Sequence, residues 1–315
     1  MNDRAIWPSA RRGQPIAIIG GPAYPGGMFG FFNVNKPAGP TSHDIVARIR
    51  CILAGPVKVG HAGTLDPFAS GVLVVCVGAA TRLAEYVQGQ PKCYSVEVAL
   101  GATSSTDDPE GRITETPQAS PPDEAEVRRV LAGFVGLIDQ VPPAHSAVHV
   151  EGRRAYSLAR AGRDVRLPAR QVRIHRIELL SYKYPHLRLE VLCGSGTYMR
   201  SLARDVGAAL GAGGYCLHLT RTAIGPFVLS QALAVEKLDP RRDLLDPLTA
   251  LQDMPRVTVG DLQASRLVRG NAVELAEAAA GGEVAVLDAQ GRLLAIARTE
   301  KESHLLSPTK VFPAD

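Results

Sequence analysis

The feature that most constrains the fold is a polar loop that runs directly into a long apolar stretch. The loop carries His61 and Asp66, and Pro67 follows the acid at once. Gly71 then leads into residues 72–77, which are apolar and mostly β-branched. Such a run bounded by turn residues predicts a buried strand, so a lone acid should stand beside a rigid apolar element. Because an Asp before Pro is also a common turn or cap residue, the pattern alone leaves the role of Asp66 open.

Other segments carry clear helix or strand patterns. Alternation of apolar and polar side chains predicts strands, whereas apolar side chains on one face of a helical wheel predict amphipathic helices. Ser42 is expected to be the N-cap of the first helix. Strands are predicted at residues 92–100 and 187–193, and helices at residues 44–53, 79–87 and 121–135.

The composition is that of an ordinary soluble globular protein. Of the 315 residues, 45% are hydrophobic and 21% are charged, and the length allows one large domain and a second small one. The five cysteines form no C-x-x-C pair, and Cys76 lies in the apolar run, so we expect core thiols in a reducing compartment. No apolar run approaches the roughly 18 residues of a membrane span. We therefore expect a cytoplasmic protein without membrane association.

The positive charge of the chain is concentrated in residues 151–176. This segment holds eight arginines and two acids, a net charge of +6, whereas the whole chain carries +4. A run of cations is often only a solvated face. Guanidinium groups within an otherwise slightly acidic protein, however, favour contact with phosphate. The segment therefore predicts nucleic-acid binding, with Arg153, Arg154, Arg160 and Arg163 as the candidate RNA-binding residues.

A polar segment at residues 103–111 contains two adjacent acids, Asp107 and Asp108. Two acids in one loop could indicate a Mg²⁺ site. A solvated turn is the expected structure, because the segment is rich in Ser, Thr, Asp and Gly. No segment shows the ligand spacing of a zinc site, so no metal site is predicted.

The residues around Asp66 read GHAGTLDPFASGVL, a string that closely resembles the signature of the bacterial tRNA pseudouridine-55 synthases, the TruB family. Further family elements follow in order over residues 28–230. In one of them Ser195 replaces the usual Lys and Met199 the usual Ile, which leaves the residues of the chemistry untouched. The matched positions are Lys36 in K-P-x-G, Asp107 and Gly111 in T-D-T-x-D-x-x-G, Tyr198 and Arg200 in C-x-K-G-T-Y-I-R, and Leu219 and Arg221 in L-x-R-x-x-x-G-x-F.

The resemblance implies that the chain isomerises uridine 55 in the T loop of tRNA to pseudouridine. The glycosidic bond moves from a nitrogen to a carbon of the same base, and in the family the Asp of G-x-L-D-P, here Asp66, is the nucleophile. A buried carboxylate that must stay ionised needs a nearby cation, for which Arg200 is the candidate. The target nucleotide lies in a folded loop and must therefore be flipped out into the pocket.

Four further substrate-site residues follow from the same resemblance. Tyr94 is the family-matched aromatic floor for the released uracil, and its phenol could move the last proton. Tyr198 and Leu219 would pack and orient the base. His61 would hold the substrate or occupy the gap that the flipped base leaves, unless it only stabilises its loop.

The reaction gains and loses no electrons, so no cofactor is expected, and the sequence carries no cofactor fingerprint. The expected partner is tRNA, bound through its T arm. We expect a monomer that needs no obligatory protein partner, because the Arg-rich segment suggests direct recognition of tRNA.

The resemblance also predicts the fold. We expect an α+β catalytic domain of the pseudouridine synthase type at residues 28–255, with a mixed, largely antiparallel sheet, flanking helices and an Arg-rich RNA-binding insertion at about 151–176. Residues 1–27 are rich in Gly and Pro and are expected to be a loosely ordered tail. Residues 256–315 resemble a PUA domain, a small RNA-binding β-barrel, because residues 283–298 have the pattern of a hairpin.

Two other functions share parts of this pattern. A non-catalytic RNA-binding or RNA-folding protein of the same fold is the main alternative, but it would have no need of Asp66, Tyr94 and Arg200 together. A glycosidase-type hydrolase would need a second carboxylate beside Asp66, and the signature segment offers none. We therefore predict the synthase.

Overall fold

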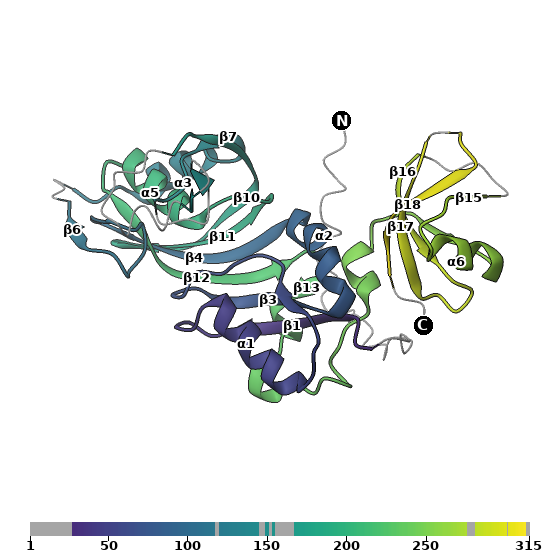
Figure 1. Ribbon diagram of the computed structural model, residues 1–315. Helices are drawn as coiled ribbons and strands as arrows, with labels where there is room; N and C mark the ends of the chain where they lie inside the picture. The colour runs from purple at the N-terminus through teal and green to yellow at the C-terminus, as the bar shows by residue number, and fades with distance from the viewer. Residues whose placement is uncertain are drawn as a thin grey trace. The chain divides into compact units, whose positions relative to one another are not determined.

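A computed structural model of the chain describes residues 27–116, 120–144, 149–150, 153–154, 167–275, 281–300 and 302–312. The chain divides into two compact units (Figure 1). The larger unit comprises Asn33–Cys76 and Thr81–Lys237 and contains Asp66. The smaller unit is formed mainly by the segment from Leu238 onward, together with Val77–Ala80 and the described residues before Asn33.

The larger unit is built around a mixed sheet to which, among the described residues, nine strands contribute. The strand order is β1-β3-β12-β4-β11-β10-β7, with β2 paired to β3 and β13 paired to β12. β12 and β3 run parallel, whereas the ladders from β12 through β4, β11 and β10 to β7 are antiparallel. The predicted α+β fold with a largely antiparallel sheet is confirmed. The strands are β1 (Gly30–Lys36), β2 (Val59–His61), β3 (Ser70–Val77), β4 (Lys92–Leu100), β7 (Gly136–Gln140), β10 (Arg170–Lys183), β11 (His186–Cys193), β12 (Gly214–Ile224) and β13 (Phe227–Val228).

The burial of the central strands follows their sequence patterns. β3 is buried along almost its whole length, as its apolar run predicts, and β4 alternates so that Tyr94 lies on the same face as two buried valines. The parallel contact between β3 and β12 consists of two residue pairs, Thr220↔Ser70 and Arg221↔Gly71. Gly71 is required there, since its φ is 103° and an added Cβ would lie 2.2 Å from the backbone oxygen of Arg221.

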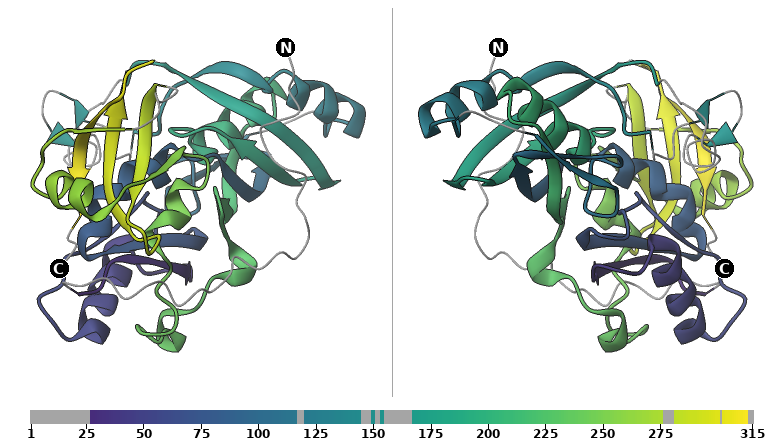
Figure 2. Two further views of the ribbon diagram at one scale, coloured as in Figure 1. Left: turned by 90° about the vertical axis from the view of Figure 1, so that its right-hand side faces the viewer. Right: turned by 90° about the vertical axis from the view of Figure 1, so that its left-hand side faces the viewer.

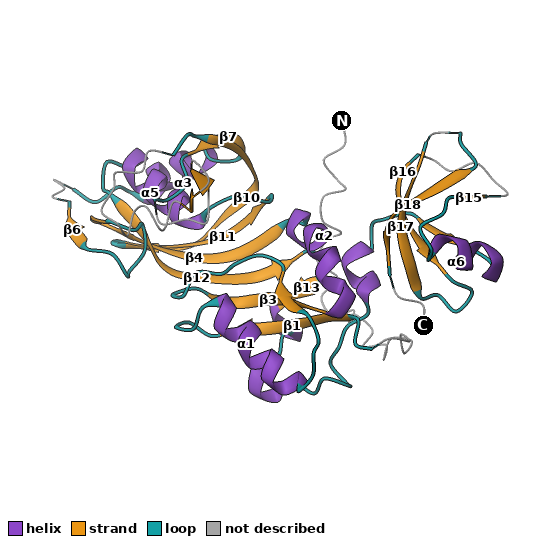
Figure 3. Ribbon diagram, viewed as in Figure 1, coloured by secondary structure: helices purple, strands orange, loops and turns teal. Residues whose placement is uncertain are grey.

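The helices lie against this sheet. α5 (Met199–Ala209) packs mainly against β12 and also contacts β4, and α3 (Glu124–Ala132) contacts β10 and α5 (Figure 3). The predicted helix at residues 79–87 is instead a 3₁₀ helix over Gly78–Leu83 that continues as α2 (Ala84–Gly89).

The first helix, α1 (Ser42–Leu53), differs from expectation at its start. Its N-cap is Thr41 rather than Ser42, because Thr41 forms a reciprocal capping box with Asp44. Ser42 is released from capping and instead exchanges two hydrogen bonds, of 3.0 and 2.8 Å, with the backbone of Leu65. The start of the helix therefore anchors the loop that carries Asp66.

The smaller unit contains a sheet in which, among the described residues, five strands have the order β14-β16-β17-β18-β15. Its strands run side by side in both views of Figure 2. The hairpin predicted from alternation is confirmed as β16 and β17, and residues that include Leu267 and Leu306 form an apolar core of this unit. This arrangement is consistent with the predicted PUA-like domain. The elements are β14 (Arg256–Thr258), α6 (Asp261–Leu267), β15 (Val273–Glu274), β16 (Gly282–Leu287), β17 (Leu293–Thr299) and β18 (Leu305–Val311).

Only part of the Arg-rich segment belongs to the described residues. Arg160 and Arg163 lie outside them, as do residues 1–26 of the expected tail. Arg153 and Arg154 form β9, a short strand that pairs with β8 (His149–Val150). Residues 170–176 belong to β10 and pair with β7 and β11, so this end of the segment is part of the main sheet. In the described part of the chain no helix is long and apolar enough to cross a membrane.

Candidate active site

A cavity of about 700 Å³ opens beside Asp66 in the larger unit. Its wall is formed by the loop after β2, the end of α2 with the start of β4, the residues before and at the start of α5, and the middle of β12. The cavity brings together five of the six residues that the sequence predicted for substrate chemistry: Asp66, Tyr94, Tyr198, Arg200 and Leu219.

Asp66 is held by two nitrogens of a single guanidinium. Nε of Arg200 lies 2.9 Å from Oδ2 of Asp66, and Nη2 donates to Oδ1 at 3.2 Å. The Arg200 side chain is 4% exposed, whereas that of Asp66 is 34% exposed, so the carboxylate keeps a free surface. Burial raises the pKa of Asp66 above its usual value, and the charge of Arg200 opposes that shift. The pair therefore places an acid at the cavity wall with a cation fixed behind it.

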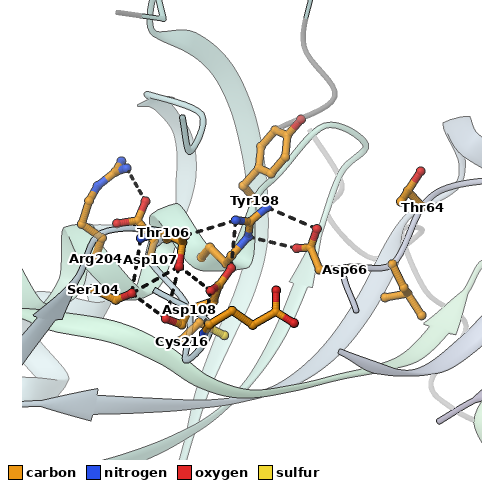
Figure 4. Close-up of polar contacts among 12 residues, drawn as sticks. Thr64, Asp66, Ser104, Thr106, Asp107, Asp108, Tyr198, Arg204 and Cys216 are labelled. Atoms are coloured by element: carbon orange, nitrogen blue, oxygen red, sulfur yellow. Dashed lines mark hydrogen bonds and ion pairs between the residues drawn. The ribbon is translucent and has the colours of Figure 1, made fainter. Parts of the chain in front are cut away.

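The same guanidinium is held from behind by a second acid, Asp108. Nη1 of Arg200 donates to Oδ2 of Asp108 at 3.0 Å and to the backbone oxygen of Thr106 at 3.1 Å (Figure 4). The Asp108 carboxylate also accepts a hydrogen bond from the backbone of Glu110. The prediction of a solvated turn is wrong for this acid, because it is buried against a buried arginine.

The neighbouring acid points to a different arginine. Asp107 adopts a left-handed φ of 62°, and its Oδ2 accepts a hydrogen bond from Nη1 of Arg204 at 2.9 Å. Arg200 and Arg204 are four residues apart and therefore lie on one face of α5. Two successive acids of one loop thus bind two successive turns of one helix. Sequence reasoning missed this role of Asp108, although its segment matched a family element.

Two buried cations fix the loop around Asp66. Arg221 donates from its three nitrogens to the backbone oxygens of Val72, Thr64 and Gly63 at 2.8, 3.3 and 3.0 Å. Lys36, which the family match placed near the site, is fully buried. Its Nζ donates to the backbone oxygens of three prolines, one of which, at 3.2 Å, is Pro67, the residue after Asp66. Burial lowers the pKa of Lys36 to about 8.

The remaining predicted residues differ in their positions. Tyr94 and Leu219 are buried on the adjacent strands β4 and β12, and both line the cavity. Burial raises the pKa of Tyr94, and the nearby Arg221 opposes that shift. His61 ends β2 and is partly buried, but it does not line this cavity. Burial and the charge of Arg221 lower the pKa of His61, which favours the neutral imidazole.

No metal ligand set is present in the part of the chain that the structure describes: no three His, Cys, Asp or Glu side chains lie close enough together to hold an ion. Several polar groups of the cavity wall are instead paired within the protein. Asp66 and Arg200 bind each other, and the backbone of Tyr198 exchanges hydrogen bonds with the Gln140 side chain at 2.8 and 3.1 Å. The arrangement offers a fixed carboxylate, a fixed cation and an aromatic wall.

Comparison with known proteins gives one consistent result. Residues 50–199 match the sequence model of a family described as TruB family pseudouridylate synthase (N terminal domain). The tRNA pseudouridine synthase B of Symbiobacterium thermophilum is 46% identical over 245 residues, which cover 76% of this chain and 82% of that protein. The protein of the same name from Thermobifida fusca is 42% identical over 290 residues, which cover 89% and 97%.

Solved structures agree with these relatives. A Cbf5-Nop10-Gar1 complex contains a chain that is 27% identical, with a TM-score of 0.69, and the match covers 91% of this chain and 86% of that one. A chain of an H/ACA RNP bound to a substrate RNA containing 2'-deoxyuridine is 25% identical, with the same TM-score and coverage. The similarity therefore extends over both units of the chain.

Proposed function

The chain belongs to the TruB family of pseudouridine synthases, and on that premise we propose that it converts uridine 55 in the T loop of tRNA to pseudouridine, with Asp66 as the nucleophile. The observation that carries the proposal is the Asp66 carboxylate, which is held by two nitrogens of Arg200 and keeps a free surface at the wall of a cavity. In this proposal the acid meets the sugar of a bound nucleotide, and Arg200 favours its ionised form.

The chemistry needs only groups that the cavity supplies. The Asp66 carboxylate attacks the anomeric carbon, and the electron pair of the broken bond leaves with N1 of the uracil. In the other possible route, the carboxylate assists formation of a glycal. In the first route C5 of the uracil then attacks the anomeric carbon and displaces the Asp66 carboxylate. In the second route the sugar regains the proton that it gave up when the glycal formed, as its anomeric carbon bonds to C5. In both routes C5 finally loses its proton and N1 gains one. Substrate and product are therefore isomers, and no cofactor is consumed.

The released uracil must stay in the cavity and turn before it bonds again. A volume of about 700 Å³ lies within the range of small-molecule sites and accommodates one flipped nucleotide. Tyr94 forms an apolar floor with a phenol that can move a proton, and Tyr198 and Leu219 pack the base. His61 would act on the substrate outside this cavity, at the gap in the RNA.

The direct test uses the purified full chain and an unmodified tRNA transcript. Pseudouridine is mapped at single-nucleotide resolution, and a transcript with cytidine at position 55 serves as the control. We expect one new pseudouridine, at position 55. Modification at a different position would contradict the assignment of the target, and tight binding without modification would support the non-catalytic RNA-binding alternative.

We further propose that this chain acts in the cytoplasm, as a monomer, without a guide RNA or a protein partner. Independence from partners needs a test, because the similar solved chains come from complexes whose names include other proteins or an RNA. The segment at residues 151–176, with its net charge of +6, would contact the tRNA directly through phosphates. Full turnover by the purified chain alone is the expected result, and a strict requirement for added RNA or protein would contradict it.

The rate should depend on the ionisation of Asp66. Attack needs the carboxylate, and burial raises its pKa, so activity is present above the raised pKa and is lost as the pH falls through it. We expect the single-turnover rate to show an acid limb with a midpoint above about 4, the usual pKa of an aspartate. Binding measured over the same pH range separates this limb from loss of tRNA affinity. A rate independent of pH down to the usual aspartate range would contradict the proposed ionisation.

Asp108→Asn should lower the rate by about tenfold to a hundredfold. The substitution removes a charge-assisted hydrogen bond to Arg200, which is worth about 1.5–3 kcal/mol. It also removes a negative charge that raises the pKa of Asp66, so the acid limb should move to lower pH while the rate falls. A pH–rate profile measures both effects. A lower rate with an unmoved acid limb would mean that Asp108 acts only on folding.

A further inference from the structure

We propose that Arg170 is an additional RNA-binding residue, whose guanidinium binds a phosphodiester group next to the target uridine. The proposal rests on the function proposed above, because it needs an RNA substrate at the same cavity. It concerns a residue that the chemistry does not use. Arg170 is the first residue of β10 and pairs with Gln140 of β7.

One edge of the Arg170 guanidinium is buried and makes no hydrogen bond to any described residue. Its Nε and Nη2 are buried, and neither has a hydrogen-bond partner among the described residues. Arg176, six residues further along the strand, lies 2.6 Å from Glu190. Leaving a buried polar donor unpaired costs about 1–3 kcal/mol, more for a charged group. Native structures rarely keep such a group unless a ligand or water completes it.

The position of this guanidinium is set by residues of the cavity wall. Cζ of Arg170 lies 4.9 Å from the centroid of the Tyr198 ring. This cation–π contact holds the cation in place but leaves its N–H groups unused. The Tyr198 backbone is itself fixed by two hydrogen bonds to Gln140, the residue that pairs with Arg170. The arginine is therefore held against the wall of the cavity that contains Asp66.

The chemistry of the edge indicates phosphate. Nε and Nη2 form one side of the planar guanidinium, the fork that engages two oxygens of an anion together. An RNA strand presents a phosphate on each side of the target nucleotide, whereas the oxygens of uracil are neutral and would leave the charge unmatched. Nε and Nη2 are buried while the residue as a whole is half-buried, so the proposal requires that the last bonds of the side chain rotate to present this edge to the backbone of a bound RNA.

The test combines a protein change with a change in the RNA. Affinity for a T-arm RNA is measured over a series of monovalent salt concentrations for the full chain, Arg170→Gln and Arg170→Lys. Arg128→Gln is the control, since Arg128 makes two hydrogen bonds to Glu124 and loses the same charge. Each salt series is repeated with RNAs in which one phosphate beside the target uridine is replaced by a neutral methylphosphonate.

Arg170→Gln should weaken binding and flatten the plot of log affinity against log salt by about 0.7–0.9, the slope of one phosphate contact. Arg170→Lys should keep the slope but not the full affinity, and Arg128→Gln should change neither. One methylphosphonate should weaken binding to the unchanged protein but not to Arg170→Gln, because the contact is already lost. In turnover, KM should rise for Arg170→Gln while kcat changes little.

Two results would overturn the proposal. A fall in kcat with an unchanged salt slope would show that Arg170 only supports Tyr198. Equal losses from each methylphosphonate in both proteins would show that the phosphate is bound elsewhere. The binding readout does not depend on turnover, so failure of the tRNA transcript to be modified would count against the proposed function alone. Melting temperatures of all variants exclude misfolding as the cause.

Discussion

Asp66→Asn is expected to abolish pseudouridine formation while tRNA affinity stays within about tenfold. The amide keeps the size of the side chain but has neither the charge nor the nucleophilicity of a carboxylate. Asp66 is one of many residues that line the cavity, and most of the affinity for RNA is expected from phosphate contacts elsewhere, so binding should be largely retained. Single-turnover pseudouridine mapping and a binding titration on the same preparation measure the two quantities.

The matched control for this variant is Asp139→Asn, which removes the same charge from an exposed position on β7. Its activity should equal that of the unchanged chain. Residual activity of Asp66→Asn above about 1% would remove Asp66 from the role of nucleophile. Such residual activity must be separated from deamidation back to aspartate, for which mass spectrometry of the variant is sufficient.

Arg200→Gln should have the second largest effect, a loss of at least about a hundredfold at neutral pH. Removing the cation leaves Asp66 and the buried Asp108 without the positive charge that lies between them, and breaking a buried ion pair such as that of Arg200 with Asp108 costs about 3–5 kcal/mol. The pKa of Asp66 should rise further, since the charge of Lys36 alone then opposes burial and the charge of Asp108. Activity should therefore recover in part as the pH is raised, which a pH–rate profile would show.

Arg200→Lys separates charge from geometry. A lysine keeps the cation but offers one nitrogen, whereas Arg200 contacts Asp66 through two nitrogens and Asp108 through the third. We expect an acid limb close to that of the unchanged chain, together with a rate that stays strongly reduced. If the lysine variant were fully active, the fixed geometry of the carboxylate would be unimportant. Melting temperatures of both variants control for loss of the fold.

The sequence was informative where a local pattern determines the structure. The apolar run of β3 predicted a buried strand, and the alternation of residues 92–100 predicted β4, because side chains on a strand alternate between two faces. The hairpin of β16 and β17 and the helix α3 follow from equally local signals. The start of α1 was misassigned by one residue, since Thr41 and Ser42 are both good caps and only the position of Asp44 decides between them.

The parts that were missed depend on long-range contacts. Asp108 looked like a residue of a solvated turn, and only the fold shows that it meets Arg200, which is 92 residues away. The buried edge of the Arg170 guanidinium was missed for the same reason. The sequence shows a run of arginines but not which of them is buried without a hydrogen-bond partner. The RNA-binding roles of Arg153, Arg154, Arg160 and Arg163 stay predictions.

The parallel ladder between β3 and β12 consists of two residue pairs, and this has a consequence for the heat inactivation of the enzyme. Asp66 precedes β3, while Tyr94, Leu219 and Arg200 belong to elements on the other side of this contact. A short ladder is easier to open than the long antiparallel ladders beside it, and this one depends on the side-chain hydrogen bonds of Arg221 to the backbone of Gly63, Thr64 and Val72. Local opening of this contact would separate Asp66 from Arg200 while both halves of the sheet stay folded. Reversible heat inactivation should therefore precede melting, and the first backbone amides to exchange with solvent should lie near Gly71.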